Sequence, residues 1–247
     1  MARYALDVHF RQEDVSPEAL ARRTVVVIDV LRATTSLAAA LAAGAREAWC
    51  FRSVPQVYRA RKRLGKRAFL LCGERRGVRI RGFDLGNSPR DFTSAQCEGR
   101  TLLMTTTNGT RALCLARRAS EIVTASFVNI RAVVKRIHKD KGDLALLCAG
   151  TNGQVSMDDA ACAGALIEAL GDQERSLSRQ AEEAVRIWRG AKRSLTEFLL
   201  ASEGGVPLVQ AGLGRDVHDC ARRNRYDVVP RVAGWSEDGR ACRLIAP

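Results

Sequence analysis

Four side chains suited to phosphate chemistry follow one short apolar run in this sequence. Residues 24–28 are a β-branched run without a polar break, the pattern of a strand buried on both faces. The run ends on Asp29. A turn that carries Arg32, Thr34 and Thr35 then leads into an Ala- and Leu-rich helix. Ligands of open α/β sheets bind where strands end and helices begin. Hydroxyls and free N–H groups there suit an anion, and an Asp suits a hard cation, so the turn predicts a site for a phosphate and its metal.

A second hydroxyl-rich stretch, Thr105–Arg111, follows a predicted strand and precedes a predicted helix. Its sequence, TTTNGTR, combines hydroxyl groups with a glycine-relaxed backbone that suits a bound phosphate. Arg32 and Arg111 stand out among the arginines because each lies inside such a turn, where a guanidinium can bind phosphate, carboxylate or sulfonate through paired hydrogen bonds. A capped turn with β-branched residues at the strand end gives the same composition, so both interpretations are kept.

Four further carboxylates lie in glycine-rich or helix-start positions. Glu74 and Asp84 fall in the glycine-rich segment 72–89, and Asp158 and Asp159 open a predicted helix. Mg²⁺ takes oxygen ligands, often one or two carboxylates together with substrate phosphate and water. The structural alternatives are a strand-end Asp that caps the next turn, a solvated loop Glu, and a pair of Asp that only stabilises the helix dipole.

Several well-known sites are absent from the sequence. It contains no G-x-x-x-x-G-K-[ST] loop, no G-x-G-x-x-G after a strand and no G-x-S-x-G elbow. Neither Cys114 nor Cys148 begins a Cys-x5-Arg loop, and Asp29 lacks the second Asp of haloacid-dehalogenase phosphatases. The three histidines are isolated, which disfavours a histidine-built metal site. None of the eight cysteines forms a C-x-x-C pair, so buried thiols in a reducing cytosol are expected.

The net charge of +13 has three interpretations: nucleic acid, an anionic small substrate, or genome composition. Only six of the 40 basic residues are Lys, so the excess is almost entirely Arg spread along the chain. No stripe of aromatic and basic residues is present, which argues against binding of single strands by stacking. We also expect no membrane span, since no apolar run approaches the roughly 20 residues that a bilayer needs. We expect no signal peptide, because residues 1–20 mix charged with apolar residues and lack an uninterrupted apolar core.

Element order predicts one α/β domain over residues 1–247, with helices on both sides of a largely parallel or mixed sheet, in three layers. Segments 102–112 and 146–156 are similar in sequence, since each is an apolar strand followed by Thr-Asn-Gly. This similarity is consistent with two similar halves. From about residue 172 we expect a helical part, and the tail 235–247 has no assigned structure. Expected strands are 2–10, 24–28, 47–51, 67–71, 100–104, 121–125 and 143–148. Expected helices cover 36–43, 54–64, 88–96, 129–139, 157–170, 173–201 and 211–223. Another is expected to begin at Ser16, and one follows Arg111 and runs to about residue 117.

The motifs taken together resemble the 2-phosphosulfolactate phosphatase family. The matching stretches are IDVLRATTS (28–36), CGERRG with GFDLGNSP (72–89), TTTNGTRAL (105–113), CAGTNGQVSMDDAACAGAL (148–166) and DVHDCARRNRYDVVP (216–230). They cover most of the chain in the right order. The resemblance implies Mg²⁺-dependent hydrolysis of the phosphate ester of a 2-hydroxy acid, giving 3-sulfolactate and phosphate in coenzyme M biosynthesis.

Site roles follow from that resemblance as hypotheses. The catalytic candidates are Asp29, Arg32, Ser88 and Arg111. The substrate-binding candidates are Thr34, Thr35, Asn87, Thr107, Asn108, Gly109 and Thr110. The Mg²⁺ ligand candidates are Asp29, Glu74, Asp84 and Asp158. Attack by water is favoured over a phosphoenzyme on Asp29 or Ser88, and both stay open.

Two other functions compete with this hypothesis. A non-catalytic basic α/β domain would bind nucleic acid or another anionic ligand, and its support is the charge alone. A phosphosugar or nucleotide enzyme of similar architecture would differ only in substrate. For the favoured function we expect a small anionic phospho-acid as partner, a cytoplasmic location, little role for nucleic acid, and either a monomer or a homodimer.

Overall fold

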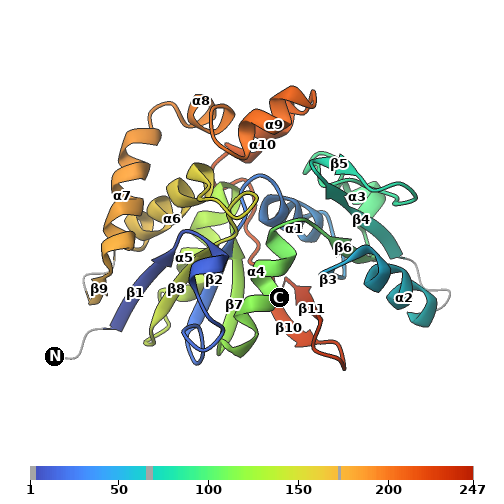
Figure 1. The fold of residues 1–247 in the computed structure, drawn as a ribbon, viewed down its shortest axis with the longest axis horizontal. Helices are drawn as coiled ribbons and strands as arrows, with labels where there is room; N and C mark the ends of the chain where they lie inside the picture. Colours follow the sequence, from blue (N-terminus) through green and yellow to red (C-terminus); the bar gives the residue numbers. More distant parts are fainter. Residues whose placement is uncertain (1–3, 65–68, 172–173, 247) are drawn as a thin grey trace.

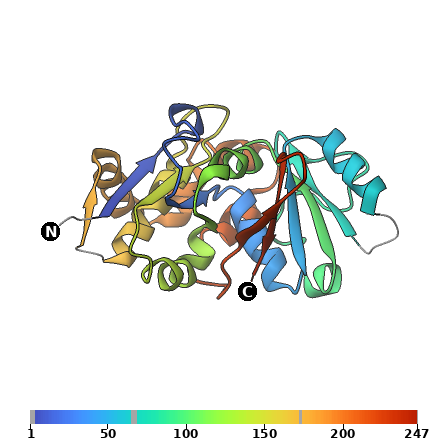
Figure 2. The same cartoon turned by 90° about the horizontal axis from the view of Figure 1, so that it is seen from below.

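A computed structural model describes residues 4–64, 69–171 and 174–246 as one mixed sheet with helices on both faces (Figures 1 and 2). The strand order is β5-β4-β6-β3-β11-β10-β7-β2-β8-β1-β9. The strands are β1 (Tyr4–His9), β2 (Thr24–Ile28), β3 (Glu47–Phe51), β4 (Phe69–Arg75), β5 (Val78–Arg79), β6 (Thr101–Thr105), β7 (Glu121–Ala125), β8 (Leu144–Cys148), β9 (Arg175–Leu177), β10 (Arg231–Trp235) and β11 (Ala241–Ile245). The α-helices are α1 (Ala33–Ala42), α2 (Val54–Leu64), α3 (Ser94–Cys97), α4 (Gly109–Leu115), α5 (Ile130–Ile137), α6 (Met157–Leu170), α7 (Arg179–Ala191), α8 (Leu195–Leu200), α9 (Gly205–Gln210) and α10 (Gly214–Cys220). This confirms the expected α/β class with a mixed, helix-flanked sheet.

The strand β2 lies inside a parallel group and is buried on both faces, as its β-branched sequence predicts. It pairs in parallel with β7 and β8, and β8 continues to β1 and β9. All five residues of β2 are buried. A second parallel group, β4-β6-β3, lies further along the sheet. Within each group, parallel pairing places the strand ends on the same side.

The hairpin β10–β11 joins the two parallel groups (Figure 2). It comes from the end of the chain, pairs antiparallel with β3 through β11, and meets β7 at Arg231. Thus the last strands of the sequence occupy the middle of the sheet. The expected unassigned tail is in fact structural, because Cys242 and Leu244 are fully buried.

Both strand groups pack on α1 and α4, which lie between them (Figure 1). One hydrophobic cluster combines Val25 and Val27 of β2 with Leu102 and Met104 of β6 and with apolar residues of both helices. On the opposite face of the first group, α5, α6 and α7 cover β1, β2, β7 and β8. Because both groups pack on the same helices, the ends of β2 and β6 are held close together although four strands separate them in the sheet order.

Some element predictions are wrong for identifiable reasons. The helix α1 begins at Ala33 rather than 36, so Thr34 and Thr35 belong to its first turn. The Ser16 and Ser88-Pro89 cap signals open turns, not helices, and the next helix after Pro89 is the short α3. The segment 72–89 is partly a β4–β5 hairpin.

The last third is not only helical. It contains β9 and the β10–β11 hairpin besides the helices α7 to α10. The two Thr-Asn-Gly turns also differ, because the one at 107–109 opens α4 whereas Thr151 and Gln154 close a tight turn across the other. Among the described residues, no helix is both long and apolar enough to cross a membrane.

The close packing of α6 on α7 depends on Gly164. A Cβ built there would lie 1.9 Å from the Ala184 carbonyl oxygen and 2.8 Å from the Trp188 Cβ. We expect Gly164→Ala to lower the free energy of unfolding by about 1–3 kcal/mol through overpacking, measured by urea denaturation. Gly190→Ala on α7 is the matched control, since nothing lies within 4 Å of its Cβ, and it should stabilise by up to about 1 kcal/mol. Equal effects of the two changes would contradict the packing account.

Candidate active site

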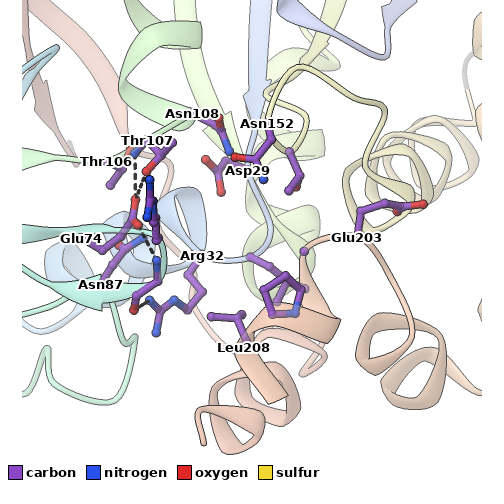
Figure 3. Close-up of a pocket in the computed structure, with 16 residues that line it drawn as sticks. Asp29, Arg32, Glu74, Asn87, Thr106, Thr107, Asn108, Asn152, Glu203 and Leu208 are labelled. Atoms are coloured by element: carbon purple, nitrogen blue, oxygen red, sulfur yellow. Dashed lines mark hydrogen bonds between the residues drawn. The ribbon is translucent and has the colours of Figure 1, made fainter. Parts of the chain in front are cut away.

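A polar cavity of about 120 Å³ opens at the carboxyl ends of β2, β4, β6 and β8 (Figure 3). Helix α9 and the turn before it cover one side, and the tip of the β4–β5 hairpin covers another. Its lining residues are Asp29, Leu31, Arg32, Glu74, Arg76, Gly77, Asn87, Thr106, Thr107, Asn108, Thr151, Asn152, Glu203, Gly204, Pro207 and Leu208. Ligands of open α/β sheets bind at this position, outside the carboxyl ends of the strands.

Asp29 ends β2 and lies almost fully buried at this cavity, with 7% of its surface exposed. One carboxylate oxygen accepts a 3.0 Å hydrogen bond from the N–H of Ala33 in the first turn of α1. The other faces Gly109 at the start of α4, where an added Cβ would lie 2.6 Å away. Only glycine permits this approach, which explains why the helix after β6 starts with that residue.

Burial raises the pKa of Asp29 to about 7. The N–H groups of Ala33 and Gly109 favour the charged form, while the nearby charges of Asp158 and Glu74 oppose it. The carboxylate thus has little positive charge beside it to balance its ionised form. A cation in the cavity would supply that charge.

Glu74, at the end of β4, ties two walls of the cavity together (Figure 3). One oxygen accepts hydrogen bonds of 2.8 and 2.9 Å from the N–H and hydroxyl of Thr107. The other accepts from the Gly77 N–H at 2.8 Å. Glu74 therefore fixes the loop after β6 and the hairpin tip, while its remaining lone pairs face the cavity.

Arg32 is held by a buried ion pair that the sequence interpretation missed. Its guanidinium bonds to the Asp216 carboxylate of α10 at 2.6 Å and donates to the Gly77 carbonyl at 2.7 Å. The Ser88 hydroxyl donates to the second Asp216 oxygen at 2.7 Å. Asp216 stands in the stretch 216–230 that carried part of the family resemblance, but nothing in its sequence context indicated this partner.

Asp158 and Asp159 lie behind the cavity wall rather than on it. Asp159 accepts from the N–H groups of Val30 and Gly150, which joins the ends of β2 and β8. Asp158 accepts a 2.5 Å hydrogen bond from Ser156. Burial raises the pKa of both carboxyls, and for Asp159 the charges of Asp158 and Asp29 add to that effect.

Several predicted site hydroxyls hold the backbone instead of facing a ligand. Thr34 accepts from the Asp29 N–H at 3.1 Å, and Thr35 donates to the Val30 carbonyl at 2.8 Å. Thr110 donates to the Thr106 carbonyl at 2.9 Å. These contacts shape the two turns that carry the cavity-lining groups.

Two predicted residues lie away from the cavity. Asp84 is exposed and accepts from the Leu71 N–H at 2.8 Å. Arg111 is half exposed, with Glu13 3.8 Å away. Of the predicted set, the cavity brings together Asp29, Arg32, Glu74, Asn87, Thr107 and Asn108. The members that do not line it are Thr34, Thr35, Asp84, Ser88, Gly109, Thr110, Arg111 and Asp158.

The sequence interpretation also missed lining residues. Asn152 lines the cavity near Asn108 (Figure 3), and the repeated Thr-Asn-Gly sequence was the signal that could have found it. For Arg76 at the hairpin tip, the glycine-rich CGERRG stretch was the available signal, whereas Glu203 and Leu208 near α9 had none.

Asp29 and Glu74 are the two predicted metal ligands that line the cavity. Within the described residues, no group of three or more His, Cys, Asp or Glu is placed to hold a metal ion. Mg²⁺ does not need such a group, because it commonly takes one or two carboxylates and completes its shell with water and phosphate. The buried, poorly balanced charge of Asp29 beside Glu74 therefore fits this ion.

These features define an α/β protein with a polar, carboxylate-bearing cavity at the ends of parallel strands. The chain belongs to the 2-phosphosulpholactate phosphatase family, whose model matches residues 9–234. A probable 2-phosphosulfolactate phosphatase of Carboxydothermus hydrogenoformans is 39% identical over 219 residues, covering 88% of this chain and 89% of the relative. Proteins of the same description from Symbiobacterium thermophilum and Clostridium beijerinckii are 38% and 34% identical, over 86% and 91% of this chain and 92% and 95% of their own. The resemblance seen in the motifs is confirmed.

The pKa of Asp29 predicts how stability depends on pH without metal. Between its ordinary value of 3.8 and about 7, the unfolded chain releases this proton and the folded protein keeps it. This carboxyl therefore stabilises the fold at low pH, and its contribution is lost as the pH rises to about 7. We expect Asp29→Asn in EDTA to raise Tm at about pH 8 by at least ~2 °C, and by less at about pH 5, measured by scanning calorimetry. Asp84→Asn, which removes an exposed carboxylate, is the control. A difference that does not change with pH would contradict the assignment.

Proposed function

We propose that this protein hydrolyses the phosphate ester of 2-phosphosulfolactate, with Mg²⁺ as cofactor. The reaction joins water to the phosphorus and breaks the ester bond, giving the 2-hydroxy acid 3-sulfolactate and inorganic phosphate. The observation that carries the proposal is the buried carboxylate of Asp29 at the end of β2, facing Thr107 and Asn108 across one cavity. The names of the relatives support the substrate.

Asp29 and Glu74 would hold the metal ion. Bound there, Mg²⁺ would act as a Lewis acid toward the phosphoryl oxygens. The amides of Asn108 and Asn152 line the same cavity and can donate hydrogen bonds to those oxygens.

Direct attack by water is favoured over a phosphoserine intermediate. The Ser88 hydroxyl donates to Asp216 and its side chain does not line the cavity, so it lacks a path to the phosphorus. Water needs no such side chain. This contact argues against a phosphoenzyme on Ser88, and the alternative of a phosphoenzyme on Asp29 stays open.

Arg32 and Arg76 are the cations among the lining residues, and they differ in whether their side chains are already hydrogen-bonded to the protein. Arg32 is buried and already bonded to Asp216 and Gly77. Arg76 is exposed at the hairpin tip, and no hydrogen bond or ion pair joins its side chain to another described residue. The substrate carries carboxylate and sulfonate besides phosphate, so we assign Arg76 to an acid group remote from the phosphorus.

The physiological setting follows as part of the same proposal. All eight cysteines are free, and seven are buried, which suits a reducing cytoplasm. Release of 3-sulfolactate would supply coenzyme M biosynthesis. The alternative function, nucleic-acid binding, is supported by the overall charge. Binding of polynucleotide is therefore one outcome of the phosphate-release experiment.

Phosphate release tests the reaction and its metal. With 2-phosphosulfolactate, 2-phospholactate, 2-phosphoglycolate, 3-phosphoglycerate and a nucleotide, we expect turnover of the 2-phospho acids with Mg²⁺ and none in EDTA. Asp29→Asn should lower kcat by about 10²–10³-fold or more. Arg111→Gln should stay within about threefold, because this side chain lies outside the cavity. No release from any substrate, together with salt-sensitive binding of polynucleotide, would favour the binding-protein alternative.

The role of Arg76 predicts a specific change in substrate preference. Arg76→Gln should raise KM for 2-phosphosulfolactate by about 10- to 100-fold, the loss of one charge-assisted hydrogen bond, with little change in kcat. The effect on 2-phospholactate, which lacks the sulfonate, should be much smaller. Arg79→Gln, on the same hairpin but outside the cavity, is the control. An equal rise in KM for both substrates would show that Arg76 does not bind the sulfonate.

A further inference from the structure

A second cavity, of about 550 Å³, is lined by Asp219, one turn along α10 from Asp216. Ligand pockets commonly enclose about 300–1,000 Å³, so its size suits a small molecule. The last turn of α1, the segment after Ser88 and the stretch after α10 form its walls.

Three arginines in this cavity share one counter-ion. Arg90 lies 3.6 Å from the Asp219 carboxylate, and Arg222 and Arg225 each lie 3.3 Å from it. Asp219 is largely covered, with 13% of its side chain exposed. Three guanidinium groups and one carboxylate leave a net charge of +2 among these lining residues.

These ion pairs are loose and leave donors free for a ligand. Charge-assisted N–H···O bonds usually measure about 2.7–2.9 Å, shorter than any of the three distances. Each guanidinium carries five N–H donors, which one shared carboxylate cannot satisfy. An anion with several oxygens would therefore form new bonds without first breaking strong ones.

The end of α1 is the wall that disfavours an anion, because a helix C-terminus carries a partial negative charge that the arginines must offset. The α1 carbonyls of Ala39, Ala40 and Leu41 already accept hydrogen bonds from the N–H groups of Ala43, Ala45 and Gly44. The ring of Tyr226 lies under the Arg225 guanidinium, 5.2 Å from its centre, and holds that side chain at the cavity. The site is thus partly formed before a ligand arrives.

We propose that this second cavity binds a compact phosphate-bearing anion through Arg90, Arg222 and Arg225. The ligand is either free phosphate or pyrophosphate, or the phosphate end of a small metabolite. The segments that form the site also reach the first cavity: Asn87 lines it, Ser88 bonds to Asp216, and α10 carries Asp216 as well as Asp219. A bound anion would therefore stabilise the segments that hold Arg32. The inference does not depend on which substrate the active site takes.

Calorimetric titration of the full-length protein with pyrophosphate, in EDTA at low ionic strength, tests the site. The double variant Arg222→Gln, Arg225→Gln should weaken pyrophosphate binding by at least about tenfold, because it removes two guanidinium groups that form charge-assisted hydrogen bonds. Arg61→Gln with Lys62→Gln, an equal charge change on the exposed face of α2, is the matched control and should bind as the wild type does. Titration with AMP and with inorganic phosphate distinguishes a metabolite from the free ion.

Asp219→Asn provides a second variant with the opposite expectation. It raises the net charge of the cavity and removes the competing carboxylate, so pyrophosphate should bind at least about threefold more tightly. Unchanged affinity in both the double-arginine variant and Asp219→Asn would overturn the proposal. Equal weakening in the double-arginine variant and the α2 control would also overturn it, because the binding would then reflect overall charge alone.

Discussion

The contact between the Asp29 carboxylate and the start of α4 is the constraint on which the rest of the site depends. Asp29 follows β2 of the first parallel group. Its carboxylate lies against the start of α4, the helix that follows β6 of the second group. The shared packing of both groups on α1 and α4 makes this contact possible, and Gly109 leaves room for it. A carboxylate buried in this way is costly unless a cation or a proton accompanies it. The fold thus prepares a position for positive charge before any ligand binds.

A buried ion pair connects the end of the chain to that position. Arg32 follows Asp29 by three residues, yet its partner Asp216 comes from α10, far along the sequence. Loss of one member of such a pair typically costs about 3–5 kcal/mol, because the other charge remains buried and unpaired. The second cavity lies one turn further along α10, at Asp219. The last third of the chain is therefore part of the site as well as of the sheet.

Much of the fold and part of the site could be predicted from the sequence, and the failures share a physical cause. Local patterns placed β2, β3, β7, α2 and α6 at their observed limits, because burial and helix caps are encoded within each segment. The β10–β11 hairpin was missed because its pairing with β3 involves residues about 190 positions away in the chain, which local composition does not record. For the same reason the sequence identified Arg32 but not Asp216. Thr34, Thr35 and Thr110 were predicted as substrate ligands because a hydroxyl that caps a turn and one that binds phosphate have the same local sequence.

Titration of the protein with Mn²⁺ as a paramagnetic substitute for Mg²⁺ tests the central claim most directly. At about pH 6.5, where much of Asp29 is protonated, we expect wild-type protein to bind one ion and to release protons as it does so, which buffers of different ionisation enthalpy will reveal. Asp29→Asn should bind at least about tenfold more weakly and release fewer protons. Binding of the same affinity and proton release in both proteins would contradict the claim that this buried carboxylate holds the metal.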